Sequence, residues 1–230
     1  TAVMSCCRRF SPTHFRESFL RGIMMNKGLL FVVSAPAGCG KDTILEQMFK
    51  KTDTVGYSVS ATTRAPREGE VDGVHYHFLT RDRFEQLIAD GGVLEYTEYC
   101  GNYYGTPRKG VEDLLAQGKD VILKIEVEGA MNIRRLFPEC CLVFILPPSM
   151  HELERRLRKR GTETEEKIRE RTAQARNEIK LAEHYDYLIT NGELDIAVDD
   201  LLAVIRAEKL RRTRNTALLE CLSAEGCENT

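Results

Sequence analysis

The stretch Leu29-Leu30-Phe31-Val32-Val33-Ser34-Ala35-Pro36-Ala37-Gly38-Cys39-Gly40-Lys41-Asp42-Thr43 decides the fold. An apolar run and a turn of small residues lead into the helical pattern of residues 44–49, which predicts a strand, a loop and a helix. Backbone N–H groups of such a loop point at phosphates, Gly38 and Gly40 let the backbone approach them, and Lys41 adds positive charge. The sequence therefore predicts a phosphate-binding loop at residues 35–43 that holds a nucleoside triphosphate.

This loop departs from the usual pattern G-x-x-x-x-G-K-[ST] at two positions. Ala35 replaces the first glycine, and Asp42 replaces the hydroxyl residue after the lysine, with Thr43 one place later. A plain turn with a solvated Lys41 is the alternative, which the strand-loop-helix context disfavours. Mg²⁺ has two candidate ligands here, the Asp42 carboxylate and the Thr43 hydroxyl, because hard cations prefer oxygen.

Length and composition indicate one main domain. The chain has 230 residues, of which 42% are hydrophobic, so it can bury one sizeable core. Its formal net charge of −2 gives no overall field that would recruit nucleic acid or an anionic membrane. No apolar stretch reaches the length of a membrane span. We therefore expect neither nucleic acid nor a membrane as a partner.

The eight cysteines show no C-x-x-C spacing, and their adjacent doublets suit neither a zinc site nor a disulfide framework. They indicate reduced thiols, and we expect a cytoplasmic protein. Cys39 alone lies in the predicted phosphate-binding loop. A helix N-terminus can lower the pKa of such a thiol and make it reactive, but we favour a small residue tolerated in the turn.

Both ends of the chain differ from its centre. Residues 1–26 carry four arginines against one acid and lack the apolar core of a secretory signal. An organelle-targeting presequence, an artefact of an upstream start and a short ordered extension are the three interpretations. We favour the second, a disordered or non-native extension, because Met24 and Met25 directly precede the first predicted strand. Residues 213–230 show little pattern and predict a partly mobile tail.

Between these ends, strand-like apolar runs alternate with helical patterns. This alternation predicts an α/β fold, a three-layer core in which helices cover both faces of a parallel sheet. The expected strands are residues 29–34, 121–126, 141–146 and 187–190. The expected helices are residues 41–51, 111–117, 129–137, 150–160, 165–183 and 194–210.

Residues 57–106 break the alternation with short β-rich pieces and predict a lobe inserted into the core. Ligands of open α/β sheets bind beyond the carboxyl ends of the strands, so such a lobe is placed to hold a second substrate. Its two arginines, Arg64 and Arg67, suit a phosphate monoester because planar guanidinium groups pair with its charged oxygens. Solvated loop arginines beside Glu68 and Glu70 are an equally weighted alternative.

The same lobe gathers hydroxyl groups around one carboxylate, Glu95. The hydroxyl groups belong to Tyr76 and to residues within the segment 101–106. A carboxylate accepts two hydrogen bonds from guanine N1–H and its exocyclic amine, a donor pair that adenine lacks, and a hydroxyl donates to O6. An exposed acid and ordinary packing of the tyrosines are the alternatives.

Five segments together resemble guanylate kinases, the enzymes that phosphorylate GMP with ATP: residues 34–43, 58–70, 101–106, 147–149 and 160–165. The resemblance implies a guanylate kinase-like domain at residues 27–212, with a GMP-binding lobe at 57–106 and a helical lid at 156–171. It also implies phosphorylation of GMP, and of dGMP, by ATP with Mg²⁺, as part of purine nucleotide metabolism.

The resemblance assigns candidate residues by position. The guanine base is read by Ser60, Glu95 and Thr106, and the phosphate of GMP is held by Arg64, Arg67, Tyr76 and Tyr104. Lys41 matches the lysine of the phosphate-binding loop. The arginines that close over the transferring phosphoryl group from the lid match Arg156, Arg160 and Arg171. Asn191 matches a position near the ATP adenine.

One position departs from the family. Guanylate kinases commonly carry an acid at the place of Lys124, where it helps to bind the nucleotide or to organise the metal region. Contact with a phosphate, an ion pair with Glu126 or Asp42, and exposure to solvent are the interpretations open for this lysine.

Two other functions compete with a GMP kinase. The first is a non-catalytic guanylate kinase-like module that binds phosphorylated peptides; such modules typically lose the phosphate-binding loop and the lid arginines, which this chain keeps. The second is a kinase for another phosphorylated small molecule, which Glu95 with Ser60 disfavours. The arginine-rich run 155–160 is not interpreted as a nucleic-acid site because acids follow it at once. Oligomeric state is left open.

Overall fold

A computed structural model describes residues 28–99, 101–159 and 164–223. Its main sheet has five strands in the order β2-β7-β1-β8-β9, and all neighbouring pairs are parallel. They are β2 (Val55–Tyr57), β7 (Asp120–Lys124), β1 (Leu30–Ser34), β8 (Cys141–Leu146) and β9 (Tyr187–Thr190). The four predicted strands are confirmed to within two residues. The fifth, β2, was missed because three residues at a sheet edge carry too short a pattern.

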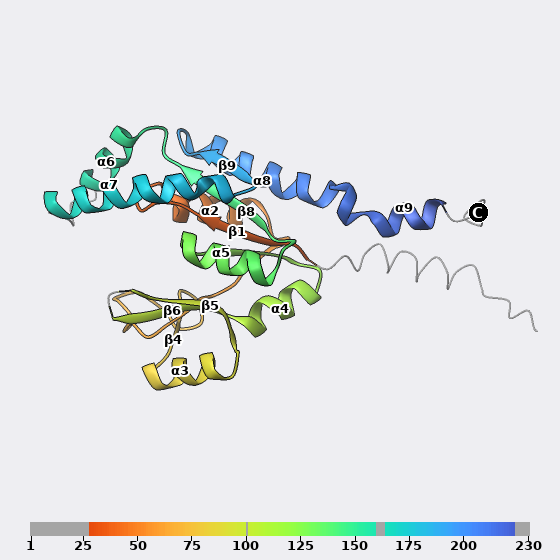
Figure 1. Ribbon diagram of the computed structural model, residues 1–230, viewed down its shortest axis with the longest axis horizontal. Coiled ribbons are helices and arrows are strands. Elements are labelled where there is room, and N and C mark those ends of the chain that lie inside the picture. The colour runs from red at the N-terminus through yellow and green to blue at the C-terminus, as the bar shows by residue number, and fades with distance from the viewer. Residues whose placement is uncertain (1–27, 100, 160–163, 224–230) are drawn as a thin grey trace, which may run out of the picture.

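Side chains alternate along β1 and divide the core into two apolar clusters. Phe31 and Val33 pack with α2 (Lys41–Lys51), α6 (Met150–Lys159), α7 (Glu165–Lys180) and α8 (Leu194–Leu210). Leu30 and Val32 pack with α4 (Arg108–Ala116) and α5 (Val127–Leu136) on the opposite face. Figure 1 shows these helices above and below the sheet, so the expected three-layer α/β core is confirmed.

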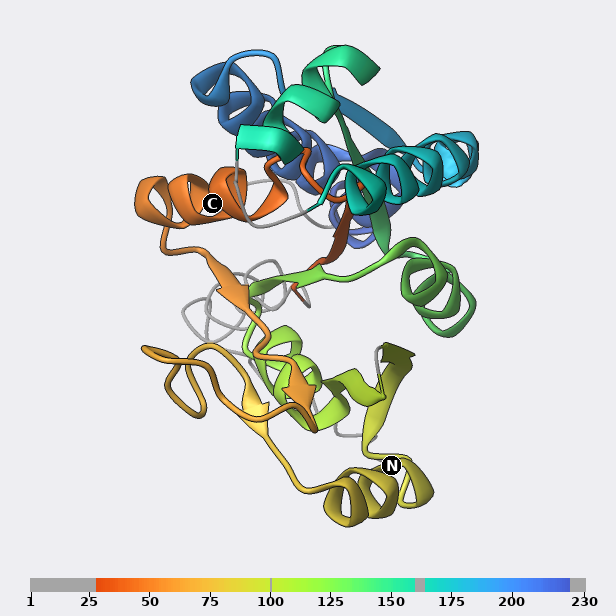
Figure 2. The ribbon, with the colours of Figure 1, turned by 90° about the vertical axis from the view of Figure 1, so that its left-hand side faces the viewer.

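The inserted lobe contains a second sheet in the order β4-β3-β6-β5. Its strands are β4 (His77–Phe78), β3 (Ala61–Thr62), β6 (Asn102–Pro107) and β5 (Val93–Tyr99). The lobe also holds a helix that the sequence did not predict, α3 (Arg81–Ala89), which Thr80 caps by accepting a hydrogen bond from the Arg83 backbone. In Figure 2 the lobe lies at the bottom and α6 at the top, with α2 and α5 between them.

The end of the described chain is more regular than predicted. After α7 a short 3₁₀ helix, η1 (Leu181–His184), precedes β9, and η2 (Arg212–Arg214) and α9 (Thr216–Ser223) follow α8. Glu208 is buried and accepts hydrogen bonds from Tyr187 Oη at 2.8 Å and from Arg214 Nη2 at 2.9 Å, which fixes the turn after α8. Residues 1–26 lie outside the described part. Within the described ranges, no helix is both long and apolar enough to cross a membrane.

Candidate functional site

The phosphate-binding loop lies between β1 and α2, as predicted. Gly38 and Gly40 have φ values of 92° and 84°, a region that favours glycine. No side chain caps α2, whose first N–H groups lack acceptors within the helix. The loop therefore presents backbone donors and the positive end of a helix dipole, which suits a polyphosphate.

Asn191 holds this loop in place. It follows β9, is 7% exposed, and donates a hydrogen bond from Nδ2 to the Cys39 carbonyl at 2.7 Å. A Cβ atom on Gly40 would lie 2.5 Å from the same Nδ2, so the close contact requires glycine. The resemblance implied that Asn191 lies near the adenine of ATP, which stays a prediction; in the described structure its side-chain amide supports the loop.

Lys41 begins α2 and points toward the end of β7. Its Nζ lies 3.4 Å from the Ile125 carbonyl and 3.7 Å from Glu126 Oε1, and its side chain is only 12% exposed. These oxygens fix the ammonium beside the loop. The ammonium is placed to neutralise phosphate charge there.

Of the three interpretations open for Lys124, the structure shows an ion pair with Asp42. Its Nζ lies 3.0 Å from Asp42 Oδ1, so the lysine pairs with the residue that replaces the usual hydroxyl residue of the loop.

In the inserted lobe, Arg64 is surrounded by polar and aromatic groups. Its Nη1 and Nη2 donate to both carboxylate oxygens of Glu70 at 2.9 and 2.8 Å. Its guanidinium lies 5.6 Å from the ring centre of Tyr76, and the rings of Tyr76 and Tyr104 are 6.1 Å apart. Three of the four predicted phosphate-holding residues are therefore brought together.

Glu70 was not predicted as a functional residue. Hydrogen bonds from Arg64, with a further one from the Arg67 backbone N–H, hold the pKa of Glu70 at about 2. Its carboxylate thus occupies the guanidinium edge that would receive a phosphate. The side chain of Arg67 is exposed near this pair. The sequence spacing of Arg64 and Glu70 did not predict their contact, because the two residues meet in a loop and not at the regular spacing of a helix.

Glu95 and Thr106 form the second predicted cluster of the lobe. They face each other across β5 and β6, and Thr106 Oγ1 donates to Glu95 Oε1 at 2.6 Å. Both side chains are buried, and burial raises the pKa of Glu95 although the Thr106 hydrogen bond opposes it. Ser60, also predicted to read the base, is half-buried just before β3, where its carbonyl accepts from the His77 N–H at 2.8 Å.

The first turn of α5 connects the lobe to the phosphate-binding loop. Glu126, which pairs with Lys41, precedes this helix. Two residues into the helix, a Cβ atom on Gly129 would lie 2.8 Å from Glu95 Oε2. The carboxylate predicted to read the base and the lysine predicted to bind phosphate therefore both lie near the start of α5.

The lid arginines lie on α6 and α7. Arg156 Nε donates to Glu152 Oε1 at 2.8 Å, and its Nη2 donates to the Asn191 carbonyl at 3.0 Å. Arg156 is therefore tied to the residue that supports the loop. Arg171 is half-buried on α7, and Arg160 lies outside the described residues. Glu152 was missed, although its spacing of four residues from Arg156 was a usable signal.

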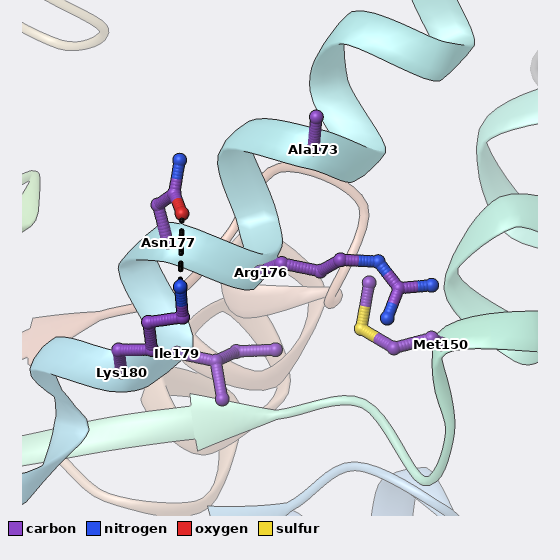
Figure 3. Close-up of a pocket in the computed structure, with 6 residues that line it drawn as sticks. All are labelled: Met150, Ala173, Arg176, Asn177, Ile179 and Lys180. Atoms are coloured by element: carbon purple, nitrogen blue, oxygen red, sulfur yellow. Dashed lines mark hydrogen bonds between the residues drawn. The ribbon is translucent and has the colours of Figure 1, made fainter.

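Two features are set apart from this chemistry. Cys39 is fully buried, and burial raises the pKa of its thiol to about 12, which confirms the interpretation of a small residue tolerated in the turn. A hollow of about 550 Å³ lies between Met150 at the start of α6 and one face of α7 (Figure 3). None of the predicted site residues lines it. Its lining residues are Met150, Ala173, Arg176, Asn177, Ile179 and Lys180.

Comparisons with known proteins agree with this geometry. A family model described as guanylate kinase matches residues 27–208. The guanylate kinase of Carboxydothermus hydrogenoformans is 52% identical over 190 residues, which cover 83% of this chain and 93% of that protein. The guanylate kinase of Bacillus subtilis is 50% identical over 192 residues, which cover 83% and 94%, respectively.

A solved structure shows the same likeness. The crystal structure of guanylate kinase from Anaplasma phagocytophilum matches with a TM-score of 0.72 at 33% identity, covering 88% of this chain and 97% of that one. The similarity therefore includes the phosphate-binding loop, the inserted lobe and the lid.

Proposed function

Because this chain belongs to the guanylate kinase family and is an ATP:GMP phosphotransferase, we propose how its own residues divide the work of the transfer. ATP is the donor, GMP the acceptor, and ADP and GDP the products. The observation that carries the assignment is the pairing of a buried Glu95–Thr106 cluster with Arg64 in one lobe, joined through α5 to Lys41.

GMP binds in the inserted lobe. Glu95 accepts from guanine N1–H and the exocyclic amine, while Ser60 and Thr106 complete recognition of the base. Arg64 exchanges its Glu70 carboxylate for the phosphate of GMP, and Arg67, Tyr76 and Tyr104 add further donors. The two charges of a phosphate monoester compensate Arg64 better than the single charge of Glu70. We expect dGMP as a second acceptor because this set leaves the 2′ position of the ribose unused.

ATP binds at the phosphate-binding loop. Backbone N–H groups of the loop and of the first turn of α2, together with the Lys41 ammonium, hold the donor phosphates. Arg156, Arg160 and Arg171 approach the transferring phosphoryl group from the lid side. The Glu152 and Asn191 contacts pre-organise Arg156, so less side-chain entropy is lost when it binds.

The residues of the loop fit Mg²⁺, which this family generally requires. Mg²⁺ keeps several waters and is bound through substrate phosphates and one or two protein oxygens. Thr43 and Asp42 are exposed at the start of α2 and would hold the ion, Thr43 better, because Lys124 already pairs with Asp42. The ion would neutralise charge on the donor phosphates.

The chemistry needs no strong general base. The attacking phosphate oxygen of GMP is already anionic near neutral pH, so rate enhancement depends on alignment and charge neutralisation. Water competes as an acceptor unless the site closes, which explains why the lobe and the lid flank the loop. We place this reaction in the cytoplasm, since the described cysteines Cys39, Cys140 and Cys141 are free.

A coupled assay of ADP release tests the proposal. The acceptors GMP, dGMP, AMP and UMP are compared with a reaction without acceptor. We expect rapid turnover with GMP and dGMP and little with the others. Lys41→Met serves as the catalytic control and should lower kcat by about 10²-fold or more. Equal rates with AMP and GMP would contradict the assignment of the lobe.

A further inference from the structure

Lys124 and Asp42, the two positions where the site departs most from expectation, contact each other. Their side chains form an ion pair of 3.0 Å. Asp42 lies in the first turn of α2, directly after Lys41, and Lys124 is the last residue of β7. Each unusual residue thus has the other as its partner, at the edge of the sheet where ligands collect.

Lys124 also faces the inserted lobe. Its ammonium lies within electrostatic range of Tyr57 and Tyr76. The same charge acts on Tyr76, whose phenol pKa is raised by burial and lowered by Lys124. Tyr76 lies in turn beside Arg64. Lys124 therefore contacts the start of α2 through Asp42 and lies within electrostatic range of Tyr76 in the lobe.

A surface ion pair without a role in catalysis does not account for the position of Lys124. The Lys124 side chain is only 28% exposed, whereas Asp42 is 76% exposed, so the lysine is the member that the fold encloses. An enclosed ammonium that pairs with an exposed carboxylate can still interact with a more negatively charged group. When both nucleotides are bound, the transferring phosphoryl group is that group.

We propose that Lys124 is a further catalytic residue, whose ammonium contacts the phosphoryl group during its transfer from ATP to GMP, and that Asp42 holds this ammonium in position beforehand. The inference rests on the proposed function. The contact forms only when donor and acceptor phosphates meet, so it stabilises the transition state more than either nucleotide alone.

The test compares variants of the full chain. Lys124→Met removes the charge and keeps the length, and Lys124→Arg restores the charge. The control is Lys51→Met, at the other end of α2, where Lys51 Nζ pairs with Asp199 Oδ1 at 2.9 Å. Circular dichroism and thermal unfolding report whether each variant folds. If Lys124→Met does not fold, Lys124→Gln is used in its place.

Two measurements are made on each variant: kcat with GMP, and calorimetric affinity for GMP alone, for ADP alone and for a ligand in which a polyphosphate joins adenosine to guanosine. For Lys124→Met we expect kcat to fall by about 10²-fold and affinity for the joined ligand by about tenfold or more. Affinities for the single nucleotides should change by no more than about twofold, as should all values for Lys51→Met. Lys124→Arg should recover most of the lost kcat.

The proposal is overturned if kcat of Lys124→Met stays near that of the unmodified enzyme. It is also overturned if GMP alone or ADP alone loses as much affinity as the joined ligand, or if Lys124→Arg is no better than Lys124→Met. Failure of the proposed function itself is distinguishable, because the unmodified enzyme would then release no ADP in response to GMP.

Discussion

Glu95 combines a buried position with a proposed role, recognition of guanine, that requires negative charge. Its partner Thr106 fixes one oxygen at 2.6 Å, and the other oxygen lies against Gly129, where an added Cβ atom would be only 2.8 Å from it. The carboxylate is therefore aimed by the fold before GMP arrives, which saves side-chain entropy on binding.

The fixed orientation of the Glu95 carboxylate predicts how Glu95→Gln changes the selectivity for GMP over AMP. An amide offers one acceptor and one donor, so it accepts from N1–H or the exocyclic amine but not from both, while its NH₂ group opposes the remaining donor. We expect the ratio of kcat/KM for GMP over AMP to fall by about 10²-fold or more. Steady-state assays with both acceptors check this. An unchanged ratio would remove Glu95 from base recognition.

The same substitution should stabilise the free protein at neutral pH. Burial raises the pKa of Glu95 above its ordinary value of 4.5, so the folded state binds the proton more tightly than the unfolded state. By linkage, stability decreases as pH rises through the interval from 4.5 to the raised pKa, and the full penalty is present above it. A neutral glutamine carries no such penalty.

Thermal unfolding at several pH values measures this difference. The Tm of Glu95→Gln should exceed that of the unmodified protein at neutral pH, and the difference should shrink as the pH falls toward 4.5. A difference that grows on acidification has the wrong sign and would contradict the burial argument. The buried charge of Glu95 thus lowers the stability of the protein at neutral pH, and its proposed benefit is recognition of the base.

The residue types indicated which side chains belong to the candidate site. They did not indicate the contacts that these side chains make. Lys41, Arg64 and Glu95 could be found because glycine spacing, paired guanidinium groups and a carboxylate among hydroxyls each indicate a specific chemistry. The contacts of Arg64 with Glu70 and of Asn191 with the Cys39 carbonyl could not, because they join residues whose approach depends on loops or on a separation of 152 positions.

At the level of elements, the loop between β1 and α2 depends on one backbone position. Gly40 has φ 84° and precedes α2, and the Asn191 amide fills the space where its side chain would be. Gly40→Ala should destabilise the fold by about 1–3 kcal/mol through backbone strain. It should also displace Asn191 from the Cys39 carbonyl and weaken ATP binding.

Gly110→Ala is the matched control for this prediction. Gly110 lies on an exposed face of α4, has no positive φ, and a Cβ atom there would meet nothing within 4 Å. Because alanine is the better helix former, this variant should be neutral or stabilised by about 0.5–1 kcal/mol. Denaturant unfolding compares the two variants. Equal stability of both would mean that the loop is not strained by a side chain.

The sequence predicted long elements and missed short ones for a physical reason. Helices such as α2 and α8 carry enough turns to show an apolar stripe, and buried parallel strands show as continuous apolar runs. Strand β2 has three residues, and α3 has one buried side chain, Phe84, so neither repeats its pattern. The tail was predicted to be partly mobile because its residues show little apolar pattern, and the Glu208–Arg214 hydrogen bond that fixes the turn there leaves no periodic signal in the sequence.

At the scale of the whole molecule, the catalytic charges are divided among three parts. Lys41 belongs to the core, Arg64 to the inserted lobe, and Arg156 to the lid, and Figure 2 shows the lobe and α6 on opposite sides of α2 and α5. In the described structure Lys41 pairs with Glu126, Arg64 with Glu70 and Arg156 with Glu152, and Arg156 also donates to the Asn191 carbonyl of the core. We expect bound phosphates to take the place of these carboxylates.

This division predicts closure that requires both nucleotides. A phosphate chain that reaches from Lys41 to Arg64 and Arg156 exchanges three internal ion pairs for contacts between parts, whereas either nucleotide alone reaches only some of them. Small-angle scattering should therefore give a smaller radius of gyration with GMP and ADP together, or with the joined ligand, than with either nucleotide alone. The Tm should also rise by more than the sum of the single-ligand shifts, because each nucleotide then binds a state that the other has already favoured. Additive Tm shifts and a constant radius of gyration would mean that the site is assembled without movement, and water would then have to be excluded by side chains alone.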